Sequence, residues 1–415
     1  MPPNPSHPEM SAEHGTKTRG EEMLALRKAR MAAAPPFLKG GFRPFFFGGA
    51  AWAVGALLLW LLAFLGAAEL PSAFDALSWH RHEMLFGFVG AVVAGFLLTA
   101  IPNWTGRLPI AGAPLAALAG LWLAARAALL CSGEIGIGIA ATLDIGFYLT
   151  LAFVAAREVL AAKNRNLPIV MLVLLFAIAN AVDYAAVTGA IADSEAGFRG
   201  GIGLIVLMIS LIGGRIVPSF TRNWMNKHGI EGRLPEQPGR FDILTLAMTA
   251  LAVATWVLMP ESSVTGAALA LAGLFQAVRL WRWRGWRTLR DPLVMILHIG
   301  YAWIPAGLLL LASSILGAAI PRTAAIHALT AGAMATMILA VMTRASLGHT
   351  GRELKANPAT VAIFVLVTLG AILRVGAPLR LVDYRAGLEL AGACWGAAFL
   401  LFLVAYARVL FGSRR

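Results

Sequence analysis

Imidazole, guanidinium and carboxylate groups gather at one end of an apolar run. The segment Trp79-His80-Arg81-His82-Glu83 opens a stretch that closes with Pro102-Asn103-Trp104-Thr105-Gly106-Arg107. Such groups are costly beside lipid, and membrane helices that carry them usually use them. Neutral imidazole is the commonest side-chain ligand of transition metals and also binds haem iron. His80 and His82 are therefore candidate ligands.

A second segment repeats this pattern far along the chain. His327 opens an apolar run that closes with His349-Thr350-Gly351-Arg352, and 25 residues separate histidine from arginine in both segments (82 to 107, 327 to 352). A glycine follows each histidine five residues later, Gly87 in one and Gly332 in the other. The match indicates an internal duplication with His82 and His327 at equivalent places. One haem between two helices, with His82 and His327 as axial ligands, would suit it; histidines hydrogen-bonded to loops are the alternative.

The neighbours of His82 suit supporting roles. Side chains two positions apart on a helix point about 200° apart, so His80 and His82 cannot share one haem face. If the helix begins after His80, that residue is a candidate copper ligand or propionate partner. Arg81 is a candidate propionate partner because guanidinium binds carboxylate in bidentate fashion. Glu83 is a candidate for orienting an imidazole.

A second metal site is predicted nearer the opposite membrane surface. His298 and Tyr301 share one helix face by their i, i+3 spacing, and His349 lies at the end of another helix. A buried histidine bonded to a neighbouring helix is the alternative reading of His298. Within the apolar runs, Arg126 and Asp144 are expected to pair, because lone charges are costly there. Further candidates for contacts with a cofactor, an anion or lipid headgroups are Asn103, Trp104, Arg107, Arg215, Arg344 and Arg352.

The composition places these groups in a membrane protein. Of the 415 residues, 59% are hydrophobic and only 13% are charged, which is more apolar surface than a soluble domain can bury. The sequence predicts an all-α fold with about twelve transmembrane helices, of which the seventh and eighth are the shortest. They are placed at 45–67, 82–102, 111–131, 136–156, 168–190, 200–221, 242–259, 263–280, 292–314, 323–345, 357–377 and 386–411.

The placement of basic residues predicts the orientation. The net charge of +13 would suit nucleic acid, but the lysines and arginines lie in short segments between the apolar runs, so no nucleic-acid partner is expected. With the N-terminus inside, the inner segments hold 24 of them and the outer segments 5. This bias predicts that both termini face the cytoplasm and that His80, His82 and His327 lie near the outer surface.

A longer period divides the chain. Pro44, Pro168 and Pro292 open the first, fifth and ninth apolar runs at intervals of 124 residues (44 to 168, 168 to 292). Three units of four helices therefore fit, at about 44–160, 168–280 and 292–411, which makes helices two, six and ten equivalent. Residues 1–40 are predicted to be a polar cytoplasmic arm, in which 21–34 form a surface helix. Residues 41–415 are predicted to form one transmembrane domain.

At these motifs the sequence resembles the NnrS family of bacterial membrane proteins. The resemblance covers about residues 37–411, and its matching stretches are 79–88, 97–107, 213–224 and 327–352. That family is described as containing haem and copper and as linked to nitric oxide metabolism and nitrosative stress. The resemblance implies an inner-membrane protein that carries haem, of b type, and copper, acts on nitric oxide or its metal adducts, and uses an electron donor that the sequence does not identify.

The three units of four helices also resemble the main subunit of haem-copper oxidases and nitric oxide reductases. There, helices two and ten supply haem histidines, as His82 and His327 would here. Those enzymes also hold metal with histidines from helices six and seven, where this chain has none. The resemblance thus implies a haem site without that binuclear centre. A transporter of a metal ion or small anion that uses the same histidines and arginines, and a haem or nitric oxide sensor without turnover, are the alternatives.

Overall fold

The computed structural model describes residues 19–413, with side chains from Leu24 onward. These residues form helices and connecting turns, and no β-strand occurs among them. Twelve helical stretches are long and apolar enough to cross a membrane, since about 20 residues at 1.5 Å per residue span a hydrocarbon core of about 30 Å. The protein is therefore a multi-pass membrane protein of the all-α class.

The twelve spans follow the chain in order, and two of them are composite, each interrupted by a π-helical segment. They are α2 (Phe42–Phe64), α3–η2–α4 (Ala76–His82, Glu83–Val89, Gly90–Thr105), α5 (Ala113–Leu130), α7 (Ile137–Ala161), α8 (Leu167–Val187), α9 (Ala196–Lys227), α10 (Arg240–Leu258), α11 (Ser263–Arg282), α12 (Pro292–Ile315), α13–η4–α14 (Arg322–His327, Ala328–Met334, Ala335–His349), α15 (Pro358–Gly376) and α16 (Tyr384–Phe411). Short helices α1 (Arg19–Ala33), η1 (Pro36–Leu38), α6 (Ser132–Ile135) and η3 (Gly285–Thr288) complete the described residues.

The expected count of twelve spans is confirmed, and their observed first and last residues differ from the expected ones by at most six positions. The short seventh and eighth runs are the helices α10 and α11. The second span begins earlier than expected, at Ala76, because Asp75 accepts hydrogen bonds from the backbone N–H groups of Leu77 and Ser78 and so caps α3. His80 therefore lies inside this span and not before it.

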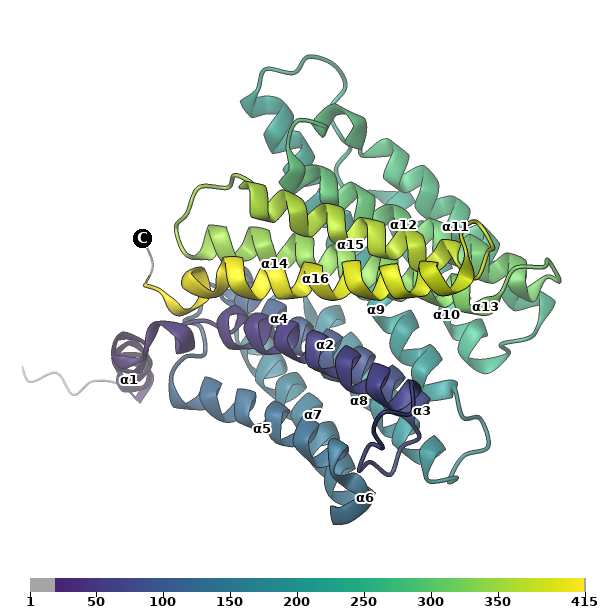
Figure 1. The fold of residues 1–415 in the computed structure, drawn as a ribbon. Coiled ribbons are helices and arrows are strands. Elements are labelled where there is room, and N and C mark those ends of the chain that lie inside the picture. Colours follow the sequence, from purple (N-terminus) through teal and green to yellow (C-terminus); the bar gives the residue numbers. More distant parts are fainter. Residues whose placement is uncertain (1–18, 414–415) are drawn as a thin grey trace, which may run out of the picture.

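The spans run side by side, and the second and tenth lie deepest in the bundle. In the second and tenth spans, 72% of an apolar 18-residue stretch is buried, against 33% in the first. The sixth span (α9) and the ninth (α12) follow, each with 61% buried. In Figure 1, α3 and α13 lie at the end of the bundle opposite to α1 and the C-terminus.

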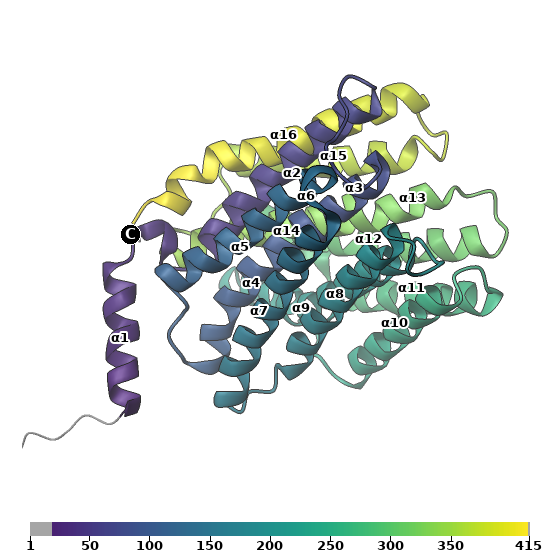
Figure 2. The same ribbon diagram turned by 90° about the horizontal axis from the view of Figure 1, so that it is seen from below.

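The helix α1 confirms the expected helix in the N-terminal arm; residues 1–18 of that arm lie outside the described part of the chain. Figure 2 shows α1 crossing one end of the bundle at a steep angle to the spans. This is the end that the basic residues predict to be the inner one, and it is called the inner end below. The opposite end, with α3 and α13, is called the outer end.

The two duplicated segments share a rare backbone feature. A seven-residue π-helix follows His82 directly, and another follows His327 directly. Such segments are uncommon and are frequent at functional sites. The repeated glycines lie in these segments, where side chains of neighbouring helices pack closely against the backbone. A Cβ atom added at Gly87 would lie 2.9 Å from Arg126 Nη1, and one added at Gly332 would lie 2.6 Å from the Trp303 ring. The duplication thus extends from the sequence to the backbone.

The repeated Thr-Gly-Arg motifs end these two spans. Gly106 and Gly351 both have left-handed backbone conformations, with φ of 67° and 76°. Thr105 and Thr350 both donate their hydroxyls to backbone carbonyls four residues earlier. A left-handed glycine directly after a helix is a common way to end it. The threonine and glycine of each motif therefore have a structural role.

Candidate functional site

His82 lies fully buried between two carboxylates. Its Nδ1 is 2.8 Å from Asp183 Oδ2 on α8, and its Nε2 is 2.8 Å from Asp144 Oδ2 on α7. Both contacts can be hydrogen bonds only if the imidazole carries two protons or one carboxyl keeps its proton. The ring is enclosed by the aromatic rings of Phe74, Phe86 and Tyr184. This arrangement holds a proton inside the bundle.

The network continues from Asp144 to Glu83. Arg126 on α5 forms ion pairs with Asp144 and with Glu83, at 2.8 Å for the second. The predicted pairing of Arg126 with Asp144 is thus present. Glu83 Oε2 also accepts a hydrogen bond from Trp52 Nε1 at 2.6 Å, whereas its buried Oε1 has no partner in the described chain. Glu83 therefore makes no hydrogen bond to the imidazole and is linked to it by the ion pairs of Arg126 with Glu83 and Asp144.

His80 points to the other side of α3, as the 200° rotation predicts. Its ring stacks on Trp60 of α2, with centroids 4.2 Å apart and an interplanar angle of 25°. The side chain lies close enough to His327 and to Arg374 of α15 for their charges to interact, and His327 and Arg374 also interact. His80 of the second span and His327 of the tenth thus lie within range of each other's charge. The structure adds an arginine from the eleventh.

The ring nitrogens show which of these histidines suit a metal. His327 Nδ1 is 2.7 Å from the carbonyl of Thr323 one turn earlier, which fixes the proton on Nδ1 and leaves the Nε2 lone pair available. His80 Nδ1 is buried and has no hydrogen-bond partner in the described chain. Both nitrogens of His82, by contrast, already contact carboxylates. His80 and His327 therefore fit metal or haem ligation, and His82 in this arrangement does not.

Arg374 fits an anionic group beside these two histidines. Its half-buried guanidinium makes no hydrogen bond or ion pair to another described residue. Arg81, the propionate partner expected from the sequence, instead pairs with Glu195 at 2.8 Å and lies over the ring of Phe198. Arginine binds carboxylates well. In the structure, therefore, Arg374 fits a propionate better than Arg81 does.

The structure places His298 and His349 against different elements. His298 Nε2 is 2.8 Å from the hydroxyl of Thr221 on α9, and its ring packs on the backbone of Gly285. His349 packs against Phe42 of α2. Tyr301 donates its hydroxyl to Gln276 and accepts from Arg279, so it does not share a partner with His298. Among residues 19–413 no group of three His, Cys, Asp or Glu side chains is arranged to hold a metal ion.

The polar candidates at the inner end contact neighbouring helices. Arg107 pairs with Glu158, Arg215 donates to Asn166 at 2.6 Å, and Arg344 lies 3.9 Å from the centroid of the Phe220 ring. Asn103 bonds weakly to its own helix, and the carbonyl of Trp104 accepts from Asn164. Arg352 lies near Arg43, close enough for their charges to interact. These residues are far from the pair His80 and His327 and do not form one site with it.

Sequence reasoning missed Arg374 and a second buried network. Arg279 on α11 pairs with Asp242 on α10 at 2.7 Å and bonds Tyr301 of α12 at 3.1 Å. The available signal was the presence of single charged residues inside or at the edge of apolar runs, which are costly unless paired or used. That signal marks Arg374 in particular, because the run 357–377 contains no acidic partner for it.

Comparison with known proteins agrees with the sequence motifs. No curated protein matches the chain. The sequence model of the family described as NnrS protein matches residues 36–414, which is nearly the whole chain and includes every spanning helix. The duplicated histidine segments and the twelve spans therefore belong to a member of the NnrS family.

Proposed function

We propose that this protein holds a haem group at its outer end and takes part in nitric oxide metabolism or resistance to nitrosative stress in the bacterial inner membrane. The link to nitric oxide rests on membership of the NnrS family, and the haem site rests on the geometry. His80 and His327 would be the ligands, with Arg374 as the partner of a propionate. The observation that carries this assignment is the approach of two histidines from the duplicated spans, each with a ring nitrogen left free.

The chain's own residues prepare such a site. The Thr323 carbonyl holds the Nδ1 proton of His327 and orients its Nε2. Trp60 fixes the plane of the His80 ring by stacking. The Arg374 guanidinium would neutralise a carboxylate in a region of low dielectric. A haem held by these two histidines would supply electron transfer. Direct binding of nitric oxide would then require one histidine to leave.

The network around His82 would serve proton transfer. Asp183 is slightly exposed at its side chain (12%), whereas His82 and Asp144 are completely buried. A proton that enters at Asp183 can pass through the imidazole to Asp144, since the two ring nitrogens contact the two carboxylates. Electron transfer to a group inside a membrane is favoured when a proton compensates the negative charge of the added electron. The network supports this role by its position on the same span as His80.

The test is the visible spectrum of the detergent-purified full chain, oxidised and reduced, with iron and copper content measured on the same samples. We expect the spectrum of a low-spin haem in the wild type. His80→Ala and His327→Ala should each lose most of this signal, and added imidazole should restore part of it. His82→Gln should keep the haem. His228→Ala is the matched control, because that exposed histidine bonds only the Trp224 carbonyl of its own helix.

Each other outcome would contradict a defined part of the proposal. If His82→Gln loses the haem and His80→Ala keeps it, the ligand pair is His82 and His327. If the samples contain copper and no iron, His80 and His327 are copper ligands, which imidazole also allows. If the wild type from cells supplied with haem precursor contains neither metal, the haem assignment is wrong.

Transport of a metal ion or small anion is the second candidate function. The observation that favours it is the chain of five ionisable groups from Asp183 through His82, Asp144 and Arg126 to Glu83, of a kind that proton-coupled transporters place in their bundles. Uptake into proteoliposomes that depends on a pH gradient and is abolished by His82→Gln, in a protein without haem, would favour transport over the haem proposal.

A further inference from the structure

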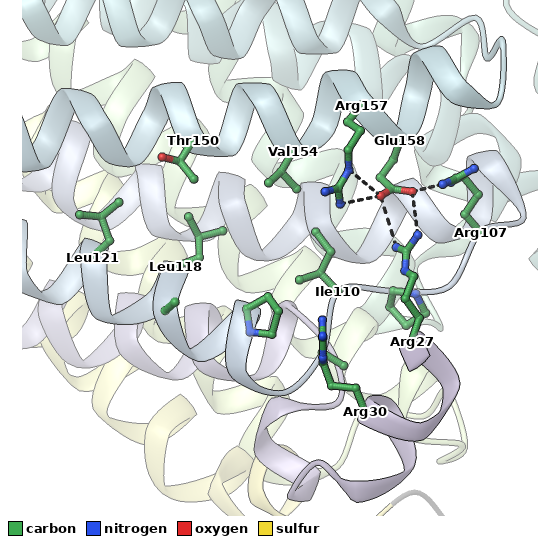
Figure 3. Close-up of a pocket in the computed structure, with 14 residues that line it drawn as sticks. Arg27, Arg30, Arg107, Ile110, Leu118, Leu121, Thr150, Val154, Arg157 and Glu158 are labelled. Atoms are coloured by element: carbon green, nitrogen blue, oxygen red, sulfur yellow. Dashed lines mark hydrogen bonds and ion pairs between the residues drawn. The ribbon is translucent and has the colours of Figure 1, made fainter. Parts of the chain in front are cut away.

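A cavity at the inner end has one charged side and one apolar side. It has a volume of about 700 Å³ and lies between α1, the segment 107–111, α5 and α7. Figure 3 shows four arginines and Glu158 gathered at one end, and Leu118 and Leu121 at the other. The cavity thus has the two-part chemistry of an amphipathic ligand.

The charged side carries more positive charge than its acid can balance. The Glu158 carboxylate is 2% exposed and pairs with Arg27 at 3.3 Å, with Arg107 at 2.5 Å and with Arg157 at 2.8 Å. Arg30 also lines the cavity, and its guanidinium group forms no hydrogen bond or ion pair with a described residue. Three guanidinium groups therefore pair with one carboxylate and a fourth lines the same cavity, an excess of three positive charges. A phosphate is the kind of anion that such a group of arginines binds.

The apolar side opens toward lipid. The lining residues Ala117 and Thr150 are exposed on the outer surfaces of α5 and α7. Large apolar side chains of the same helices, Leu123 and Phe153, are 57% and 67% exposed, as expected for a surface that faces acyl chains. The groove between α5 and α7 therefore continues from the arginines into the hydrocarbon region. A free phosphate would leave this apolar part unused.

We infer that this cavity binds an anionic phospholipid, whose phosphate contacts the arginines and one of whose acyl chains lies in the groove between α5 and α7. The helix α1 supplies Arg27 and Arg30 from its position across the inner end (Figure 2). Basic side chains at that surface attract anionic headgroups by about 1 kcal/mol each. A zwitterionic headgroup would bring its own cation to the arginines, so selectivity for an anionic lipid follows.

The test titrates delipidated full-length protein in detergent with phosphatidylglycerol, phosphatidylcholine or inorganic phosphate. Thermal unfolding gives the melting temperature at each concentration, and native mass spectrometry gives the amount of bound lipid. Phosphatidylglycerol should bind more tightly than phosphatidylcholine. Arg30→Gln should weaken it about fivefold. Lys28→Gln is the matched control, because Lys28 is exposed on the same helix and does not line the cavity.

A second pair of variants separates a lipid from a free anion. Ala117→Phe fills the apolar side and should weaken phosphatidylglycerol binding severalfold, whereas Ala124→Phe, exposed on the same helix outside the cavity, should not. Equal binding of the two lipids, or equal effects of Arg30→Gln and Lys28→Gln, would overturn the proposal. Stabilisation by inorganic phosphate as strong as that by phosphatidylglycerol, with no effect of Ala117→Phe, would assign the cavity to a free anion and also overturn it.

Discussion

His80 and His82 are two residues apart and have opposite surroundings. One stacks on a tryptophan and keeps a buried nitrogen without a partner; the other contacts a carboxylate at each nitrogen. Spacing alone predicts that the two rings point in different directions. It does not predict which ring meets acids, because Asp183 is 101 residues away in the sequence from His82. The choice between the two as ligands therefore requires the structure.

Arg126 is the residue on which the buried charge network depends most. It is fully buried and is the cation that pairs with both Glu83 and Asp144. Arg126→Met would leave two buried carboxylates without their cation, and breaking a buried pair in this way costs about 3–5 kcal/mol. We expect a large fall in the melting temperature of the purified protein. Arg215→Met, at an exposed arginine that bonds only Asn166, should change it little. Equal falls for both variants would contradict this account.

At the scale of elements, the twelve spans could be predicted from the sequence and the π-helices could not. Length and hydropathy are local properties, so each apolar run locates the ends of its helix to within six residues. The hydrogen-bond register inside a span depends on side chains from other helices, such as the Arg126 and Trp52 groups that crowd Gly87. The polar first turns of the second span lead hydropathy to place its start at residue 82, whereas the Asp75 cap starts the helix at Ala76.

Asp75 makes the stability of α3 dependent on pH. Burial raises the pKa of Asp75, but hydrogen bonds from Ser78 and Leu77 and the charge of Arg81 outweigh burial, so this pKa lies below its usual value. The lowered pKa means that the charged cap stabilises the fold above about pH 4. This stabilisation is lost as the pH falls through the folded-state pKa.

We expect Asp75→Ala to lower the free energy of unfolding by about 1 kcal/mol at neutral pH, because the cap is lost. The difference from the wild type should shrink below about pH 4, where the carboxyl is protonated in both folded and unfolded chains. Asp75→Asn, which keeps a capping oxygen but not the charge, should lie between Asp75→Ala and the wild type at neutral pH. Thermal unfolding of the three proteins across this pH range is the measurement. A difference between Asp75→Ala and the wild type that does not change with pH would refute the assignment.

The whole molecule separates two kinds of chemistry along its axis. The paired histidines, Arg374 and the proton network lie toward the outer end, and the arginine-lined cavity lies at the inner end beside α1. The duplicated spans that carry His80 and His327 are the most buried of the twelve. The cavity is formed by peripheral helices, which contact lipid. The proposed haem site thus lies on the most buried spans, and the proposed lipid site lies on helices that face lipid.

The last prediction is that the inner end of the bundle, with both termini, faces the cytoplasm. Twelve spans place both termini on one side, and the basic residues predict that this side is the cytoplasm. With Cys131 and Cys394 replaced by serine, a cysteine at Ser194 should react with a membrane-impermeant maleimide in cells whose outer membrane is permeabilised. A cysteine at Glu231 should react only after lysis. Both residues are exposed, and they lie at opposite ends of α9. The reverse pattern would move the paired histidines to the cytoplasmic surface and the arginine-lined cavity to the periplasmic one.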